Sequence, residues 1–169
     1  MGYIHVYTGN GKGKTTAALG LALRALGYNM KVYIAQFLKG MDYGEIHSLQ
    51  LFPNVTLERF GRPKFVHGKP DEEDVKLALC GLNRCREVIS SGEYDVIILD
   101  EASIAVHLGL FSVQDLLNVI SKRHERTEII ITGRYAPKEL IDAADLVTEM
   151  VEVKHYYAKG VQARKGIEF

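Results

Sequence analysis

The residues best suited to chemistry in this sequence are glycines, lysines and threonines gathered in one short stretch, TGNGKGKTT at 8–16. Glycines let successive backbone N–H groups turn toward a bound anion, and a following helix adds the free N–H groups of its first turn. Lys14 supplies a mobile cation, and Thr15 supplies a hydroxyl for a phosphate-bound Mg²⁺. The pattern predicts a P-loop, a phosphate-binding loop formed by Gly9, Asn10, Gly11, Lys12, Gly13, Lys14, Thr15 and Thr16.

The loop departs from the common pattern G-x-x-x-x-G-K-[ST], because Thr8 stands where the first glycine is expected. Gly11 and Lys12 are an extra glycine and an extra lysine within it. A chance glycine-rich turn is disfavoured by the flanking patterns. Residues 3–7 alternate as a strand does, and residues 17–26 have the composition of a helix that ends at Gly27. The departure therefore indicates a specialised member of the P-loop class.

A second group of chemical residues follows the apolar run 96–99, where Asp100 and Glu101 end a predicted buried strand. In P-loop proteins an acid at this place lies beside the loop and helps to hold Mg²⁺. We therefore expect Thr15, Asp100 and Glu101 at the metal, with Lys14 and Glu101 as the catalytic residues. Glu101 has two open interpretations: it holds the metal, directly or through water, or it polarises an attacking water as in ATPases.

Two further polar residues fall at the carboxyl ends of predicted strands, where ligands of open α/β sheets gather. Arg134 follows the strand 128–132, and its guanidinium can pair with phosphate. The alternative for Arg134 is an ion pair with Asp142 or Asp145. Gln36 lies near the end of the strand 31–37, either as a ligand or as part of a solvated strand end.

Strand and helix patterns alternate along the whole chain. Further strands are predicted at 55–60, 94–101 and 146–151, and further helices at 42–52, from Asp71 to a stop at Gly92, after a Ser112 cap, and at 137–143. Such alternation predicts an α/β fold, a mainly parallel β-sheet with helices on both faces, of the RecA-like P-loop nucleotide-binding type. The length of 169 residues predicts a single domain, 1–169.

Composition narrows the class further. There are 21 Lys+Arg against 21 Asp+Glu, and this balance disfavours a broad nucleic-acid surface. The sequence contains no apolar run of about 20 residues, and a strand begins too early to leave room for a signal peptide. We therefore expect a cytoplasmic protein with no membrane and no nucleic-acid partner. Cys80 and Cys85 are expected to be buried, reduced thiols, and the six histidines show no zinc-binding spacing.

Taken together, these segments resemble one family, the P-loop type of ATP:corrinoid adenosyltransferase. The matching segments are TGNGKGKTTAALG at 8–20, QFLKG at 36–40, ILDE at 98–101, ITGR at 131–134, LIDAADLVTEM at 140–150 and KHYYAKGVQARKGIEF at 154–169. They cover nearly the whole chain in the family's order. The threonine at position 8 is itself part of the family pattern.

The resemblance implies a particular reaction. A corrinoid in its Co(I) state attacks the 5′-carbon of ATP, and the triphosphate leaves. Such a reaction needs no proton removed, in keeping with a sequence that marks no general base other than Glu101. ATP and the corrinoid are then substrates, Mg²⁺ is the cofactor, an electron-donor protein reduces Co(II), and a homodimer is expected.

The resemblance also implies roles for single residues. Gly9 to Thr16 would bind the triphosphate, Thr15 and Glu101 would match the Mg²⁺ positions, and Phe65 would lie under the lower face of the corrinoid. The chain differs from longer relatives because it has no tryptophan and no N-terminal extension to cover the site.

Two other functions fit parts of the pattern. One is a RecA-like ATPase in which Glu101 acts as a base through water; neutral charge and small size weigh against a motor of this kind. The other is a nucleoside or small-molecule kinase, which the lack of a separate arginine-rich lid disfavours. Product analysis separates the ATPase from the transferase, because an ATPase releases ADP and phosphate whereas the transferase releases intact triphosphate.

Overall fold

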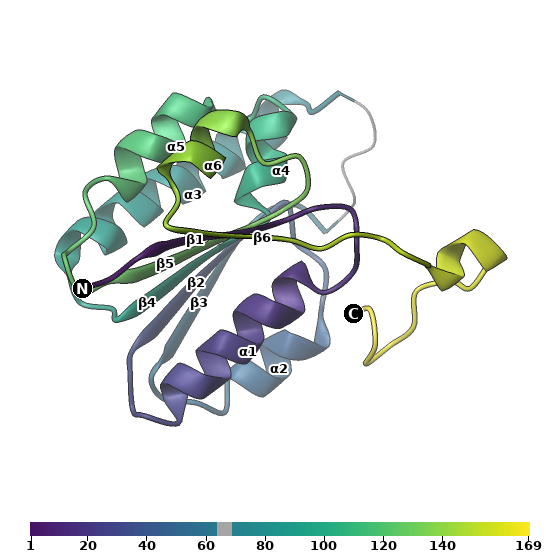
Figure 1. Ribbon diagram of the computed structural model, residues 1–169, viewed down its shortest axis with the longest axis horizontal. Coiled ribbons are helices and arrows are strands. Elements are labelled where there is room, and N and C mark those ends of the chain that lie inside the picture. Colours follow the sequence, from purple (N-terminus) through teal and green to yellow (C-terminus); the bar gives the residue numbers. More distant parts are fainter. Residues whose placement is uncertain (64–68) are drawn as a thin grey trace.

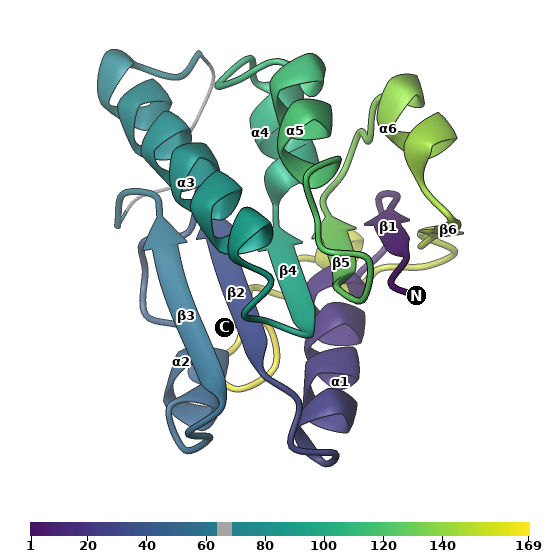
Figure 2. The ribbon, with the colours of Figure 1, turned by 90° about the vertical axis from the view of Figure 1, so that its left-hand side faces the viewer.

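A computed structural model describes residues 1–63 and 69–169 of the chain. Its centre is one all-parallel sheet of six strands in the order β3-β2-β4-β5-β1-β6 (Figures 1 and 2). The predicted fold class, α/β with a parallel sheet, is confirmed. The strands are β1 (Ile4–Thr8), β2 (Val32–Phe37), β3 (Val55–Phe60), β4 (Val96–Asp100), β5 (Glu128–Thr132) and β6 (Leu146–Glu149).

Helices cover both faces of this sheet, as the alternating pattern predicts (Figure 1). On one face lie α1 (Lys14–Leu26) and α2 (Gly44–Leu49), and on the other lie α3 (Glu72–Ser91), α4 (Ala102–His107), α5 (Val113–Ile120) and α6 (Lys138–Ala143). A short 3-10 helix, Tyr156–Lys159, interrupts the C-terminal tail.

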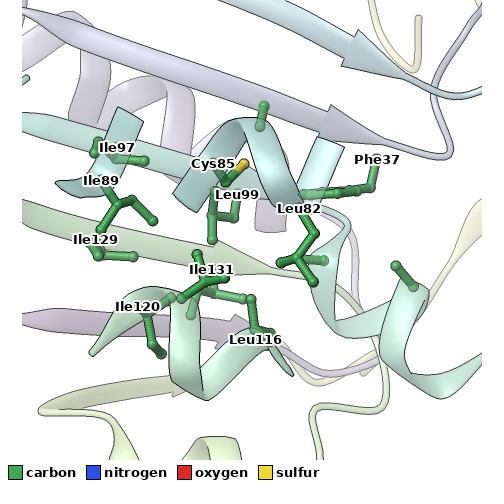
Figure 3. Packing of buried hydrophobic residues seen from close by; sticks show 14 of the residues in the cluster. Phe37, Leu82, Cys85, Ile89, Ile97, Leu99, Leu116, Ile120, Ile129 and Ile131 are labelled. Carbon is green, nitrogen blue, oxygen red and sulfur yellow. The ribbon is translucent and has the colours of Figure 1, made fainter. Parts of the chain in front are cut away.

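The two-residue period of the strands divides the core between the faces. Ile97 and Leu99 of β4 lie in the cluster under α3 and α5, whereas Val96 and Ile98 pack with the alanines of α1. Figure 3 shows the first cluster, in which Cys85 of α3 lies beside Leu99 of β4. Because each central strand buries both faces, the sheet is a rigid platform for the loops at its edge.

The loops that follow four of the strands all begin with a residue in the left-handed region. Gly9 follows β1 with φ 95°, Leu38 follows β2 with φ 59°, Glu101 follows β4 with φ 62° and Gly133 follows β5 with φ 139°. A leucine or glutamate in this conformation costs on the order of 1 kcal/mol. Such residues persist where the surroundings hold them, often at functional sites.

Several predicted elements need correction. The helix α4 was not predicted, because six residues directly after a strand offer too little periodicity to recognise. The last strand ends at Glu149 rather than at 151, and α1 begins at Lys14 rather than at 17. Cys85 is buried as expected, but the prediction for Cys80 is wrong: this thiol is exposed, since α3 buries another face.

Among residues 1–63 and 69–169, no helix has both the length and the apolar character needed to cross a membrane.

Candidate active site

A cleft of ≈ 630 Å³ opens at the carboxyl ends of the strands. The glycine-rich loop and the first turn of α1 form one wall, the start of α2 and the end of the C-terminal tail another. Lys14, Thr15, Glu101 and Arg134 all line it, so the structure brings these predicted residues to one place. The position agrees with the rule that ligands of open parallel sheets bind beyond the carboxyl ends of the strands.

Two glycines of the loop are required by its contact with the chain after β6. The Gly11 N–H donates to the Met150 carbonyl oxygen at 2.6 Å. A Cβ atom added at Gly9 or Gly11 would lie only 2.5 or 2.7 Å from that same oxygen. Thr8, which stands where the first glycine is expected, accepts the Ala136 N–H at its hydroxyl at 3.3 Å. The close packing against Met150 therefore explains the glycines at positions 9 and 11.

Lys14 and Thr15 begin α1, directly beyond the loop. The Lys14 ammonium donates to the Gly11 carbonyl at 2.8 Å, and the residue is 8% exposed. Burial lowers the pKa of Lys14, partly offset by Glu101. The Thr15 hydroxyl donates to Asp100 Oδ1 at 2.8 Å, which joins positions 85 residues apart in the sequence. Loop and acidic strand end thus form one unit, as the motifs predicted.

Asp100 is the centre of this unit, and it is only 1% exposed. Its Oδ1 also accepts the Thr132 hydroxyl at 2.6 Å, and its Oδ2 accepts Lys39 Nζ at 2.8 Å and Gln36 Nε2 at 3.4 Å. Gln36 is fully buried, so the solvated-end interpretation of this residue is wrong. The carboxylate is held by four donors from three different segments of the chain.

Glu101 lies beside Asp100 on the wall of the cleft. Its N–H donates to the Thr132 hydroxyl at 3.0 Å, which helps to hold the left-handed turn. Desolvation raises the pKa of the Glu101 carboxyl, and the neighbouring Asp100 charge adds to the rise; Lys39, Lys14 and Arg134 oppose it. The carboxyl therefore lies among cations on the wall of the cleft.

Arg134 is exposed and lines the cleft. Its two alternative partners are engaged elsewhere: Asp142 pairs with Lys138 at 2.6 Å, and Asp145 accepts the Ile4 N–H at 2.8 Å. The guanidinium is thus available to an anion in the cleft.

The C-terminal tail was not predicted to reach this site. Residues 166–169 line the cleft, and the end of the chain lies near α2, with Phe169 beside Gly44 (Figure 2). Lys12 binds the tail by donating to the Ile167 carbonyl at 3.0 Å and to Glu168 at 3.2 Å. Arg164 and the Tyr156 hydroxyl also donate to Glu168, and these contacts lower the pKa of its carboxyl.

The remaining predicted residues are placed less directly. Asn10 is exposed on the loop, and Thr16 lines the cleft. Phe65 lies outside the described residues. Besides the tail, sequence reasoning missed Lys39 at the site. The QFLKG segment, whose Gln36 was noticed, is the signal that could have found it.

The donor set suits Mg²⁺. Thr15, Asp100 and Glu101 offer hard oxygen ligands at one place, as that ion prefers. Within the described part of the chain, no group of three or more His, Cys, Asp and Glu side chains is arranged to hold a metal alone. Phosphate oxygens would therefore have to complete the coordination, which is the usual arrangement for Mg²⁺ at nucleotides.

The comparisons with known proteins decide the family. The sequence model of the family described as ATP:corrinoid adenosyltransferase BtuR/CobO/CobP matches residues 1–169. The chain belongs to this family. The corrinoid adenosyltransferase of Pseudomonas aeruginosa is 35% identical over 99% of this chain and 84% of that protein. The Escherichia coli K12 corrinoid adenosyltransferase is 34% identical over 99% of this chain and 86% of that protein.

This adenosyltransferase also shares its fold with a distant solved structure. The flagellar accessory protein FlaH from Methanocaldococcus jannaschii superimposes with a TM-score of 0.59 at 17% sequence identity, over 86% of this chain and 69% of that chain. At such low identity the likeness establishes only the α/β fold. Family membership makes the chain a transferase and supports adenosyl transfer to a corrinoid.

Proposed function

We propose that this adenosyltransferase transfers the 5′-deoxyadenosyl group of ATP to the Co(I) centre of a reduced corrinoid, in the biosynthesis or salvage of adenosylcobalamin. In this step the cobalt electron pair forms a bond to the 5′-carbon of ATP. The bond from that carbon to the triphosphate oxygen breaks, and its electron pair leaves with the triphosphate. Cobalt is oxidised by two electrons to Co(III), and no proton is removed.

Besides membership of the family, one observation supports this proposal: four cationic side chains line the same cleft at the N-terminus of α1. Lys12, Lys14, Lys39 and Arg134 all line it. A leaving triphosphate accumulates negative charge, and preorganised cations and backbone N–H groups are the means by which proteins stabilise such charge. We infer that the loop 9–16 binds the triphosphate, with Lys14 and Arg134 at its oxygens.

We further infer that Thr15, Asp100 and Glu101 hold Mg²⁺ there. When bound, the ion would neutralise part of the triphosphate charge and so make it a better leaving group. Thr15 would turn its hydroxyl from Asp100 to the ion, and Glu101 would be ionised beside it. This is the metal role for Glu101 rather than the role of a base acting on water.

Product analysis tests the proposal directly. The protein is mixed anaerobically with ATP, Mg²⁺ and a chemically reduced corrinoid; the adenosylated corrinoid is followed by absorbance and the phosphates by ³¹P NMR. We expect one triphosphate per adenosylated corrinoid and negligible hydrolysis of ATP alone. Brisk release of ADP and phosphate that Glu101→Gln abolishes would instead establish an ATPase.

Two variants test the loop. Lys14→Ala removes a cation and Thr15→Ala removes a metal ligand, so each should slow adenosyl transfer more than tenfold, about 1.4 kcal/mol or more in the barrier. Lys31→Ala is the matched control. This exposed lysine directly precedes β2, at the end of the strand away from the cleft, and pairs with Glu93. Near-normal turnover of correctly folded Lys14→Ala and Thr15→Ala would contradict the assignment of the loop.

The corrinoid position remains a proposal from the sequence. Arg62 and Asp71 flank the segment that contains Phe65, and their side chains form an ion pair at 2.6 Å. If Phe65 covers the lower face of the corrinoid, Phe65→Ala should leave ATP affinity unchanged and slow turnover with a weak reductant far more than with chemically supplied Co(I). If Phe65→Ala slows turnover equally in both assays and destabilises the protein by roughly 3 kcal/mol, seen as a lower melting temperature, Phe65 would instead be a buried core residue.

The same proposal includes the wider setting of the enzyme. We propose a single domain over residues 1–169, a cytoplasmic homodimer, and an electron-donor protein that supplies the reduced corrinoid. Size-exclusion chromatography with light scattering tests the oligomeric state. A monomeric mass with full activity would contradict the dimer.

A further inference from the structure

Lys39 enters the site through an unusual backbone turn. Leu38, which precedes it, has φ 59° at the end of β2, and this turn carries the lysine back over the strand ends. The chain at Gly61 packs directly against this turn, because a Cβ atom added at Gly61 would lie only 2.5 Å from the Lys39 backbone nitrogen. The side chain of Lys39 is only 13% exposed. The fold therefore holds the backbone of Lys39, and the ammonium lies within the site rather than at the surface.

The ammonium lies among the oxygens that the proposed metal would use. Its Nζ is 2.8 Å from Asp100 Oδ2 and 3.5 Å from Thr15 Oγ1, and it lies 3.7 Å from Glu45 Oε1. Thr15 and Asp100 are two of the three proposed Mg²⁺ ligands. An ammonium and a divalent cation repel each other strongly at such distances, so both cannot occupy this position at once.

The surrounding residues show that the cluster is organised around a cation. Gln36 is fully buried, and its Nε2 donates to both carboxylates that Lys39 contacts, Asp100 at 3.4 Å and Glu45 at 3.3 Å. Its Oε1 has no hydrogen-bond partner among the described residues. Without a positive charge, the acids Glu45, Asp100 and Glu101 would repel one another across this cluster.

We propose that Lys39 is an exchangeable cation of the active site: it occupies the metal position before substrate binds, and it moves to the triphosphate when Mg²⁺ arrives. This rests on the proposed function. Lys39 would then hold Asp100 in place for the metal in the free enzyme, and would stabilise the leaving group during transfer. The ammonium already lines the cleft, so a rotation of its flexible side chain is enough for the exchange.

The exchange predicts opposite effects of one substitution on two ligands. Lys39→Met removes a competitor for the metal and a partner for the triphosphate. Without nucleotide, Mn²⁺ used as a probe should bind about tenfold more tightly, measured by electron paramagnetic resonance. Inorganic tripolyphosphate with Mg²⁺ should bind about tenfold more weakly, measured by calorimetry, because a charge-assisted hydrogen bond is lost.

Controls separate this role from a structural one. Lys31→Met should change neither affinity, and Lys39→Arg, which keeps the charge, should retain tripolyphosphate binding. Should Lys39→Met fail to fold by circular dichroism, Lys39→Gln keeps a hydrogen-bond donor toward Asp100 and takes its place. Mn²⁺ affinity that falls or stays unchanged, or tripolyphosphate affinity that stays unchanged, would overturn the exchange. Wild-type protein that binds no tripolyphosphate at all would refute the proposed function itself.

Discussion

Replacing Asp100 by asparagine should expose how strongly the site depends on its central charge. The substitution keeps the shape of the side chain and an oxygen that can accept from Thr15 and Thr132. It turns an amide donor toward Lys39 and Gln36, which are themselves donors. Removing one partner of a fully buried ion pair costs about 3–5 kcal/mol. Because the Lys39 side chain is 13% exposed, water can solvate it in part. We therefore expect Asp100→Asn to lower the free energy of unfolding by about 3 kcal/mol, the lower end of that range.

A double-mutant cycle measures this interaction. For a chain of this size, about 3 kcal/mol corresponds to a melting temperature roughly 6–12 °C lower. Urea unfolding in EDTA, without nucleotide, should be followed for Asp100→Asn, Lys39→Met and the double variant. Asp100→Asn leaves the Lys39 ammonium only its longer contact to Glu45 at 3.7 Å. This loss does not arise once Lys39 is itself replaced, so the double variant should be more stable than the sum of the two losses predicts. The coupling energy should exceed 1 kcal/mol.

The chain offers a matched control for this cycle. Lys138 and Asp142 form an ion pair at 2.6 Å, but their side chains are 82% and 58% exposed. Their cycle should give a coupling of about 0.5 kcal/mol or less, since solvent screens exposed pairs. Losses at Asp100 and Lys39 that add within about 0.5 kcal/mol would refute the reasoning, because the pair would then contribute no more than a surface contact.

Three further predictions concern the loop, the tail and the cap of α3. Gly11→Ala should lower the free energy of unfolding by about 1–3 kcal/mol, because its Cβ would meet the Met150 carbonyl. Gly20→Ala in α1 has open space at its Cβ and should raise the free energy of unfolding by about 0.5–1 kcal/mol. Equal effects of the two substitutions in urea titrations would contradict this prediction. Lys12→Met should leave the melting temperature unchanged and speed proteolysis of the tail, since its contacts to residues 167 and 168 are lost; an unchanged cleavage rate would show that the tail is held otherwise. The backbone hydrogen bond from Asp74, with help from Arg62, lowers the pKa of the Asp71 carboxyl, so its stabilisation is present above the unfolded pKa of about 4 and is lost as pH falls through the lower folded value. The stability difference between wild type and Asp71→Ala should therefore shrink below about pH 4, and a difference independent of pH would contradict an ionic role.

Local patterns of the sequence predicted much of this fold. Asp71 and Ser112 cap α3 and α5 as predicted, and Gly92 ends α3 in the left-handed conformation that favours glycine. The bounds of β3 and β5 agree with the prediction residue for residue. The loop at 8–16 and the acids at 100–101 were also predicted to meet, and they do so through Thr15 and Asp100. These features follow from backbone conformation and alternation, which depend on near neighbours in the chain.

Other features were settled only by tertiary structure. The order of the six strands, the short helix after Glu101 and the exposure of Cys80 depend on which face each element turns to its neighbours. The sequence analysis assigned no role to Lys39. Because β2 lies beside β4, its ammonium reaches Asp100, which is 61 positions away in the sequence. The tail has little periodicity, and its contacts with Lys12 and with the start of α2 place it at the cleft. Local propensity describes each segment alone, whereas the charges of an active site are brought together by pairing between segments that are distant in the chain.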